Sequence, residues 1–367
     1  MIACCGATES SGPQDVLDSA PDWQRVLELA EHHRLLPALW RAMGPAPRVS
    51  GAIRERWRIS AWRALRLTAE LKRVAEHLGR RGMDFLAHKG PALGQLLYGD
   101  PAARQFGDLD VLVKSGDVAL AREALRDLGY EPTLRLSPQQ EREYLRSGYE
   151  YAFALGPERH LLELQWQIVP RFYAIDFDMG AIFERSIEIE VDGMRMRTLG
   201  YEDLVLVLSV HAAKHEWSQL GMLRDIAILA KRDLDWKWIV AQAKHLGIST
   251  ILQISLAAAQ SVFQIEPPEI AAHVGAETGI TEKVQRIVGN LPKDYEPHTE
   301  SLSYFRNQFQ LRERWQDQVR FIWTLATTPG VSEWKSLKVP DGAFGLYRAI
   351  RMARLIRRFA LAAGLSW

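Results

Sequence analysis

Hydrophobic residues follow a helical spacing through the first part of the chain. From Asp22 to Met43 they recur three or four positions apart, and Asp22 is a suitable N-cap for the helix that this spacing predicts. A break containing Gly and Pro follows at residues 44–51, and a longer amphipathic stretch runs from Ala52 to Leu78. We therefore expect a flexible start at residues 1–15 and an N-terminal helical segment at residues 16–80.

The spacing changes at Asp84, where short apolar runs begin to alternate with amphipathic ones. Pro91 suits the first turn of a helix, because the N–H that proline lacks would have no partner there. Buried strands are expected at residues 84–88, 109–113, 149–155 and 161–169, and helices at residues 91–97 and 118–128. Strands alternating with helices in this way predict an α/β domain over residues 81–200.

After Tyr201 the helical spacing returns. Amphipathic helices are expected at residues 203–217, 223–231, 236–246 and 251–263, and a basic helix at residues 345–361. The polar stretch 290–318 carries no clear pattern. Residues 201–367 are therefore predicted to form a C-terminal helical domain. The chain as a whole is predicted to be an α+β protein, with a mixed sheet flanked by N-terminal and C-terminal helical segments.

The composition is that of an ordinary globular protein. Of its 367 residues, 47% are hydrophobic and 25% are charged, and 46 Lys and Arg nearly balance 45 Asp and Glu. Overall charge therefore gives no reason to expect bulk nucleic-acid binding. Cys4 and Cys5 are adjacent, which argues against a disulfide framework and offers too few ligands for zinc. The chain has no signal-peptide pattern and no apolar run of roughly 20 residues, so we expect a cytoplasmic protein without a membrane span.

A pair of carboxylates marks the start of the second expected strand. Asp108 and Asp110 are two positions apart, so on a strand both side chains point to one face while Leu109 and Val111 point to the other. Neighbouring carboxylates repel each other, and Mg²⁺ or Mn²⁺, which prefer oxygen ligands, would relieve that repulsion. Glu163 lies in the middle of a later strand and reaches the same centre if the two strands are neighbours.

A glycine turn precedes the acid pair. The first strand runs into Lys89 and Gly90 and then into a helix N-terminus, where backbone N–H groups can bind phosphates. Lys89 stands beside the expected position of a triphosphate, and a solvated lysine is the alternative. Arg104 suits a contact with a phosphate or with an acid of the site, and a structural salt bridge is the alternative.

This order of strand, glycine turn, helix, acid pair and later acidic strand resembles the DNA polymerase β-like nucleotidyltransferase superfamily. The helical residues 208–217 and 223–227 resemble the second half of a large bacterial family of nucleotidyltransferase proteins. Further motifs similar to that family are Lys89-Gly90, Tyr98-Gly99-Asp100-Pro101, Arg104 and Gly107-Asp108-Leu109-Asp110. The resemblance extends over most of residues 20–265, and it implies a polymerase β-like mixed-sheet domain.

The resemblance also implies roles for individual residues. A two-metal site would be held by Asp108, Asp110 and Glu163. Glu163 would in addition be the base that deprotonates the acceptor. The nucleoside triphosphate would be bound by Lys89, Gly90, Arg104, Gly107 and Lys214.

Two positions depart from the pattern of these relatives. Most members of the superfamily have Gly-Gly or Gly-Ser at the turn, whereas this chain has Gly90 followed by Pro91. Pro91 offers a phosphate neither an N–H nor a hydroxyl. Gln165 stands where the relatives often have His, which removes a ring nitrogen. We expect both departures to affect catalytic turnover more than nucleotide binding, because neither removes an acid.

Two histidines lie on a predicted helix of the C-terminal half. His211 and His215 are four positions apart and so share a face. Ala212 stands where the helix of a zinc peptidase would carry Glu, so the pair does not match that motif. We expect both histidines to contact substrate or to form structural hydrogen bonds in the cleft between the two halves, together with His88, Lys214 and Asp225.

Arginines recur at every third position of the last expected helix and form a basic stripe. Such a stripe fits a polyanion, such as RNA or anionic lipid, or an acidic partner, and a solvated helix face is the simpler alternative. The residues concerned are Arg348, Arg351, Arg354, Arg357 and Arg358.

Together these features predict a nucleotidyltransferase that uses Mg²⁺ or Mn²⁺. An acceptor hydroxyl would attack the α-phosphate of a nucleoside triphosphate, and pyrophosphate would leave. The acceptor, whether a small molecule, a peptide, a protein or RNA, is not encoded in any residue pattern. Two alternatives stay open. One is a phosphotransferase that attacks the γ-phosphate at the same site, and the other is a nucleotide-binding or regulatory module that has lost catalysis.

Overall fold

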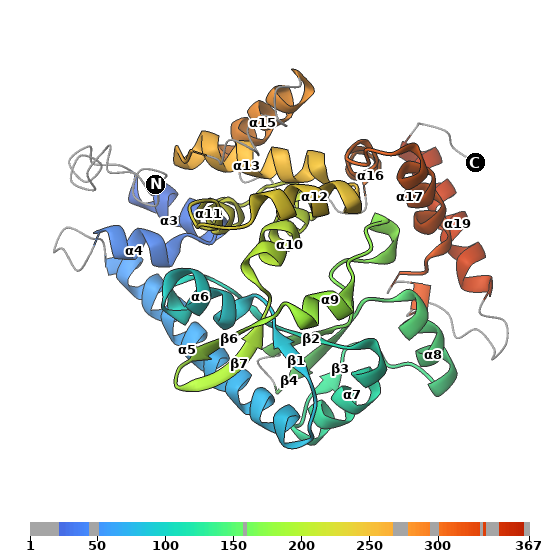
Figure 1. The fold of residues 1–367 in the computed structure, drawn as a ribbon, viewed down its shortest axis with the longest axis horizontal. Helices are drawn as coiled ribbons and strands as arrows, with labels where there is room; N and C mark the ends of the chain where they lie inside the picture. Colours follow the sequence, from blue (N-terminus) through green and yellow to red (C-terminus); the bar gives the residue numbers. More distant parts are fainter. Residues whose placement is uncertain are drawn as a thin grey trace.

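A five-stranded mixed sheet forms one half of the molecule, and helices form the other (Figure 1). The computed structural model describes residues 22–43, 51–156, 160–266, 278–293, 301–330, 333–334 and 345–362. Cys4, Cys5 and the predicted flexible start lie outside those residues. The strands of the sheet are β1 (Phe85–Ala87), β2 (Asp108–Val113), β3 (Glu131–Pro132), β4 (Glu150–Leu155) and β5 (His160–Gln165).

The strand order in this sheet is β1-β2-β5-β4-β3. Strands β2 and β5 are parallel neighbours, and the other pairs are antiparallel. A parallel pair needs a long crossover connection. Here it contains α7 (Val118–Asp127), β3, α8 (Pro138–Ser147) and β4. The topology therefore confirms the adjacency on which the expected site depended, because the strand of the acid pair lies directly beside the strand of Glu163.

The two faces of the sheet pack into different cores. Leu109 of β2 belongs to a core that it shares with α5 (Gly51–Arg80) and α7. Leu112 belongs to a second core, built mainly from the helical half. Because side chains alternate along a strand, Asp108 and Asp110 lie on the Leu112 face and point toward the helices. The predicted separation of the acid pair from its apolar neighbours is confirmed.

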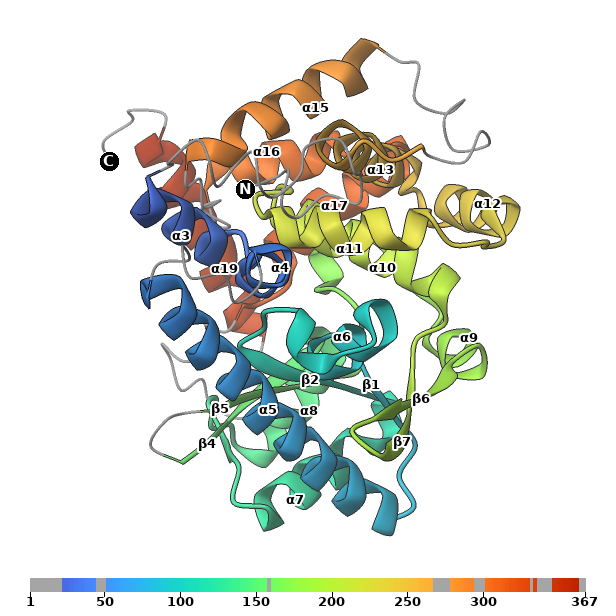
Figure 2. The ribbon, with the colours of Figure 1, turned by 90° about the vertical axis from the view of Figure 1, so that its left-hand side faces the viewer.

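The helical half covers the acid face of the sheet. Figure 2 shows α6 (Gly90–Tyr98) directly above the sheet and α10 and α11 above α6. Four helices of the helical half correspond to predicted ones, and their ends differ from the predicted ends by three residues or fewer. They are α10 (Tyr201–Lys214), α11 (Leu220–Ala230), α12 (Trp236–Leu246) and α13 (Ser249–Phe263). The other helices that the structure describes towards the C-terminus are α15 (Thr278–Asn290), α16 (Leu302–Gln310), α17 (Trp315–Thr327) and α19 (Gly345–Ala362). The predicted α+β class is therefore confirmed.

The prediction of a single helix over residues 22–43 is wrong, because the helix is interrupted. The structure has two helices there, α3 (Trp23–His32) and α4 (Leu36–Met43), joined by a turn in which Arg34 has a φ of 58°. Tertiary contacts hold this turn, since the backbone carbonyl of His33 accepts from Gly221 N at 2.9 Å and the His33 ring lies 2.8 Å from the carbonyl oxygen of Leu291. Neither contact is visible in the local spacing.

The strand predicted for residues 161–169 is shorter than expected. Strand β5 ends at Gln165, and the chain then turns towards Pro170. Trp166 and Val169 beyond it are still buried, which is why the apolar pattern continues past the end of the ladder. The polar stretch 290–318, which carried no clear pattern, contains α16 and the start of α17.

Two further elements were not predicted within residues 178–198. A short helix, α9 (Met179–Glu184), precedes a β-hairpin formed by β6 (Ile187–Val191) and β7 (Met194–Thr198). Among the described residues, no helix is long and apolar enough to cross a membrane.

Candidate active site

The three predicted acids line one cavity of about 190 Å³ between the sheet and α10. Asp110 on β2 pairs in register with Glu163 on β5, and Asp108 lies two positions earlier on the same face of β2. Asp110 is buried, and the other two side chains are partly buried. Parallel pairing thus brings the acids together although the two strands are far apart in the sequence.

Charge repulsion and burial strongly affect these carboxyl groups. Burial and the neighbouring Asp110 raise the pKa of Asp108. Burial, Glu150 and Asp110 raise the pKa of Glu163 to about 8. A carboxyl group with a raised pKa lacks sufficient positive charge around its ionised form. The acids therefore form a site that favours an added cation.

Lys89 forms an ion pair with one of the three acids. Its Nζ lies 2.8 Å from Oδ1 of Asp110. Lys89 and Gly90 have φ values of 57° and 46°, so the backbone turns sharply where β1 leads into α6. Positive φ values are unfavourable for residues other than glycine, and backbone strain of this kind is concentrated at functional sites. The turn aims the Lys89 side chain into the cavity and sets Gly90 at its wall.

Gln165, the position where relatives often have His, joins the acids to each other. Its Nε2 donates to Asp110 Oδ1 at 3.1 Å and to Glu163 Oε2 at 3.0 Å. The same nitrogen lies 3.5 Å from Oε2 of Glu150, which is opposite Gln165 in the β4–β5 register. Glu150 was not predicted as part of the site. Its alternation with the buried Tyr151 and Phe153 could have placed it on the acid face, had the pairing of β4 with β5 been known.

The far wall of the cavity comes from the end of α10. His211, Lys214 and His215 all line it, and the two imidazole rings are 4.8 Å apart in an edge-on arrangement. Lys214 Nζ lies 5.5 Å from the centre of the Tyr149 ring. Burial, together with nearby lysines, lowers the pKa of His211 and of Lys214. These residues therefore lie in the predicted cleft, as expected.

His88 lies at the base of the cavity and is 1% exposed. Burial and the adjacent Lys89 lower its pKa to about 3, so the imidazole is neutral at physiological pH. Its Nδ1 has no hydrogen-bond partner among the described residues.

Arg34 reaches the cavity from the N-terminal helices, a contribution that no local sequence signal predicted. It lies in the left-handed turn between α3 and α4 and interacts electrostatically with Asp108 and Asp110. Its side chain is exposed, and no ion pair or hydrogen bond ties it to another described residue. Arg34 is thus a cation available to an anionic ligand.

Arg104 and Asp225 form a buried ion pair behind the cavity. Arg104 Nε donates to Asp225 Oδ2 at 2.8 Å, and Tyr98 OH donates to Asp225 Oδ1 at 2.5 Å. Arg104 lines the acid cavity, whereas Asp225 does not. Of the readings of Arg104, the structure shows the structural salt bridge, formed with Asp225 of the helical half. Gly107 lies outside the acid cavity, in a neighbouring hollow where its carbonyl accepts from Arg63 at 3.3 Å.

A comparison against protein families gives a match to a large part of the chain. A family model described as an uncharacterised nucleotidyltransferase matches residues 19–264, more than half of the chain. The chain belongs to this nucleotidyltransferase family. The match includes the sheet, the glycine turn, all three acids and helices α10 to α13.

Among solved structures, an antigenic nucleotidyltransferase-like protein from Paracoccidioides brasiliensis is similar to this family member. The two are 17% identical, with a TM-score of 0.33, and the alignment covers 57% of this chain and 93% of the other. No curated protein matches the chain.

The predicted arginine stripe lies on α19, outside the part that matches the family. Arg351 and Arg354 both form ion pairs with the buried Glu333, with Nη1 to carboxylate distances of 3.5 and 3.0 Å. These two arginines therefore contact the rest of the protein as well as solvent. Arg348 and Arg357 are exposed, and the Arg358 side chain lies outside the described residues. The stripe is thus divided between an internal ion-pair cluster and a solvated edge.

Proposed function

We propose that this nucleotidyltransferase family member transfers a nucleoside monophosphate from a nucleoside triphosphate to an acceptor hydroxyl. The observation that carries the proposal is the strand register, by which Asp108, Asp110 and Glu163 line one wall of a cavity that also contains four cationic side chains. Acids on one wall suit metal ions, and cations around them suit a triphosphate. The cations are Arg34, Lys89, Arg104 and Lys214.

The donor set fits Mg²⁺ or Mn²⁺. All three acids offer oxygen ligands, and the raised pKa of Asp108 and of Glu163 marks a deficit of positive charge that a divalent cation would remove. Among the residues that the structure describes, no three His, Cys, Asp or Glu side chains are grouped closely enough to hold a metal ion. Lys89 and Gln165 occupy the hydrogen-bonding positions between the acids instead.

When bound, Mg²⁺ would neutralise the phosphate oxygens and stabilise both the attacking and the leaving oxygen. Asp108, Asp110 and Glu163 would hold it. Lys89 would then exchange Asp110 for the triphosphate at the turn where Gly90, which lines the cavity, begins helix α6. The exposed Arg34 would bind the outer phosphates.

Glu163 is the proposed base for the acceptor hydroxyl. With a pKa of about 8 it is largely protonated at neutral pH, so it can accept a proton only once nearby positive charge has ionised it. This requirement would couple base strength to the binding of the metal and nucleotide. Burial lowers the pKa of His88 and of His215 to about 3, so both imidazoles are neutral at physiological pH and are weaker bases than an ionised Glu163.

The test uses each α-labelled nucleoside triphosphate with Mg²⁺ and a cell lysate as the source of acceptor. We expect label in an acceptor fraction, release of pyrophosphate, and a loss of at least about 100-fold in Asp108→Asn. Glu131→Gln, which changes an exposed acid of the same sheet, is the matched control and should keep full activity. Release of a nucleoside diphosphate would instead identify a phosphotransferase, and full activity of Asp108→Asn would exclude the assignment.

A further inference from the structure

A second cavity lies on the other side of the end of α10 from the acid site. It has a volume of about 180 Å³, below the roughly 300–1,000 Å³ of pockets that take drug-sized ligands. Its walls come mainly from the end of α10 and the turn that follows it, from α15 and from α16. The acids of the first site do not line it, and the family match ends before α15 begins. The cavity suits a ligand smaller than a nucleotide.

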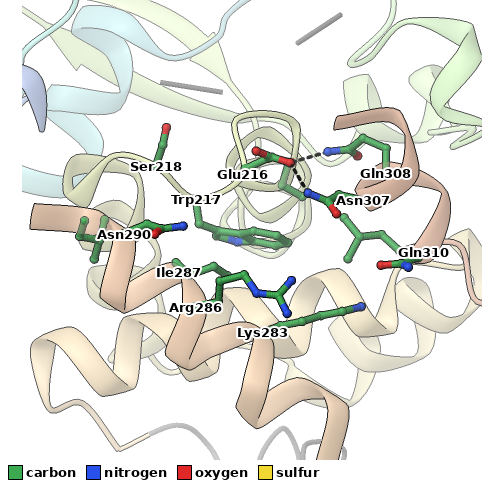
Figure 3. A pocket seen from close by; sticks show the side chains of 13 residues that line it. Glu216, Trp217, Ser218, Lys283, Arg286, Ile287, Asn290, Asn307, Gln308 and Gln310 are labelled. Atoms are coloured by element: carbon green, nitrogen blue, oxygen red, sulfur yellow. Dashed lines mark hydrogen bonds between the residues drawn. The ribbon is translucent and has the colours of Figure 1, made fainter. Parts of the chain in front are cut away.

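One wall of this cavity is cationic. Lys283 and Arg286 extend along it from α15, as Figure 3 shows. Neither side chain has an ion pair or hydrogen bond with another of the described residues. Burial and the neighbouring Arg286 lower the pKa of Lys283, because the two adjacent cations repel each other. This wall is suited to an anionic group such as a carboxylate.

The opposite wall offers acceptor oxygens. The Glu216 carboxylate lines the cavity and accepts from Asn307 Nδ2 at 2.8 Å. Gln308 is 1% exposed, and its Nε2 donates to the backbone carbonyl of Ala213 at 2.8 Å. Its Oε1 is buried and has no hydrogen-bond partner among the described residues. A buried acceptor left without a donor is costly, so this wall is suited to a ligand with N–H groups or a positive charge.

An apolar surface lies between the two polar walls. In Figure 3 the Trp217 indole lies between Glu216 and the side chains of Lys283 and Arg286, with Ile287 beside it, and both apolar side chains line the cavity. The indole is fixed, because its Nε1 donates to Ser255 at 2.8 Å. Glu216 and Trp217 have φ values of 50° and 51°, and two successive non-glycine residues in the left-handed region are strained. The strained turn directs the acid and the indole into the same cavity.

We propose that this cavity binds a small zwitterion with an apolar side chain, of the chemical class of the hydrophobic or aromatic α-amino acids. The ligand carboxylate meets Lys283 and Arg286, and its ammonium meets Glu216 and Gln308. Its side chain lies against Trp217. The site is separate from the proposed nucleotidyl transfer, so binding can be measured without any turnover.

The test is calorimetric titration of the full-length protein with L-phenylalanine, 3-phenylpropionate and 2-phenylethylamine. The last two probes lack the ammonium and the carboxylate respectively. We expect saturable binding of L-phenylalanine with one site per chain and at least tenfold weaker binding of each of the other two. Equal affinity for L-phenylalanine and 3-phenylpropionate, or no saturable binding of L-phenylalanine, overturns the proposal.

A double variant assigns the binding to this cavity. Lys283→Gln/Arg286→Gln should weaken L-phenylalanine binding at least tenfold, and both side chains are exposed or half-buried, so the change leaves the core intact. Lys293→Gln/Arg306→Gln removes the same charge from exposed residues outside the cavity and should keep the affinity within twofold. Unchanged affinity in the first variant places the ligand elsewhere and overturns the proposal.

Discussion

Lys89 Nζ lies 2.8 Å from Asp110 Oδ1, and only 14% and 4% of the two side chains are exposed. Burial alone would lower the pKa of Lys89, but the carboxylate outweighs it and the pKa is raised. Burial alone would likewise raise the pKa of Asp110, yet the ammonium lowers it. The pair is therefore charged, and it holds Asp110 in its ionised form at the centre of the acid site.

Replacing Lys89 tests how much the site depends on this pair. Lys89→Met leaves a buried carboxylate without its cation, and we expect a loss of about 3 kcal/mol in the free energy of unfolding when EDTA is present. If the acids bind a divalent cation, Mg²⁺ should restore part of this loss in the variant. Urea unfolding with and without Mg²⁺ measures both effects.

Lys72→Met is the matched control, because Lys72 pairs with the exposed Asp192 at 2.7 Å. An exposed ion pair contributes little, so this variant should lose less than about 1 kcal/mol and should not respond to Mg²⁺. Equal losses in the two variants would contradict the account of the Lys89–Asp110 pair.

The buried ion pair between Arg104 and Asp225 links the two halves of the molecule, and we expect it to contribute to the free energy of unfolding. Asp225→Asn keeps an acceptor for Tyr98 but leaves the Arg104 guanidinium, whose side chain is 11% exposed, without a carboxylate. We expect a loss of about 3 kcal/mol in urea unfolding. Asp176→Asn, which changes an exposed partner of Arg320, should lose less than about 1 kcal/mol. A stable Asp225→Asn variant would mean that Arg104 reaches solvent or another partner.

Local sequence patterns predicted most of the helices and strands and the orientation of the acid pair. Asp108, Asp110 and the buried Leu109 alternate on one short strand, so their opposite orientations follow from strand geometry alone. Glu163 could be assigned to the site only by resemblance, because its position depends on a parallel pairing between strands distant in sequence. Arg34 could not be predicted at all, since its place in the cavity depends on a turn held by Gly221 and Leu291.

One missed element did have a local signal. Ile187–Val191 and Met194–Thr198 each alternate between apolar and charged residues, and Asp192 and Gly193 separate them. Two strands joined by Asp-Gly are a strong pattern for a hairpin, and both turn residues have positive φ, at 48° and 77°. By contrast, α16 lies in a polar stretch, and its Tyr304 and Phe305 join a core only by packing with Ala174 and Phe321.

A glycine substitution tests the turn that carries Arg34. A Cβ on Gly221 would lie 2.9 Å from the carbonyl oxygen of His33 and 3.3 Å from Cβ of Arg34. Gly221→Ala should therefore push the turn away from α11 and destabilise the protein by about 1–3 kcal/mol in urea unfolding. Gly79→Ala, where a Cβ meets nothing within 4 Å inside helix α5, should instead stabilise by roughly 0.5–1 kcal/mol. A neutral Gly221→Ala would show that the close approach is easily relieved.

The last prediction concerns His215 and the dependence of stability on pH. Burial, with Lys214, Arg34 and Lys89 nearby, lowers the pKa of His215 to about 3 from its ordinary 6.5. The unfolded chain therefore binds a proton below about pH 6.5 that the folded protein does not bind, so this group destabilises the fold as pH falls from 6.5 towards 3. Between about pH 7.5 and about pH 5 the effect is at most about 2 kcal/mol.

His215→Gln removes this group, so the variant should lose less stability than the wild type over the same pH interval, by about 1–2 kcal/mol. Urea unfolding at the two pH values measures the difference. His245→Gln, which changes an exposed histidine on α12, is the control and should follow the wild type. The same loss in His215→Gln as in the wild type would mean that the imidazole is protonated in the folded protein, where it would add a further positive charge beside Lys214.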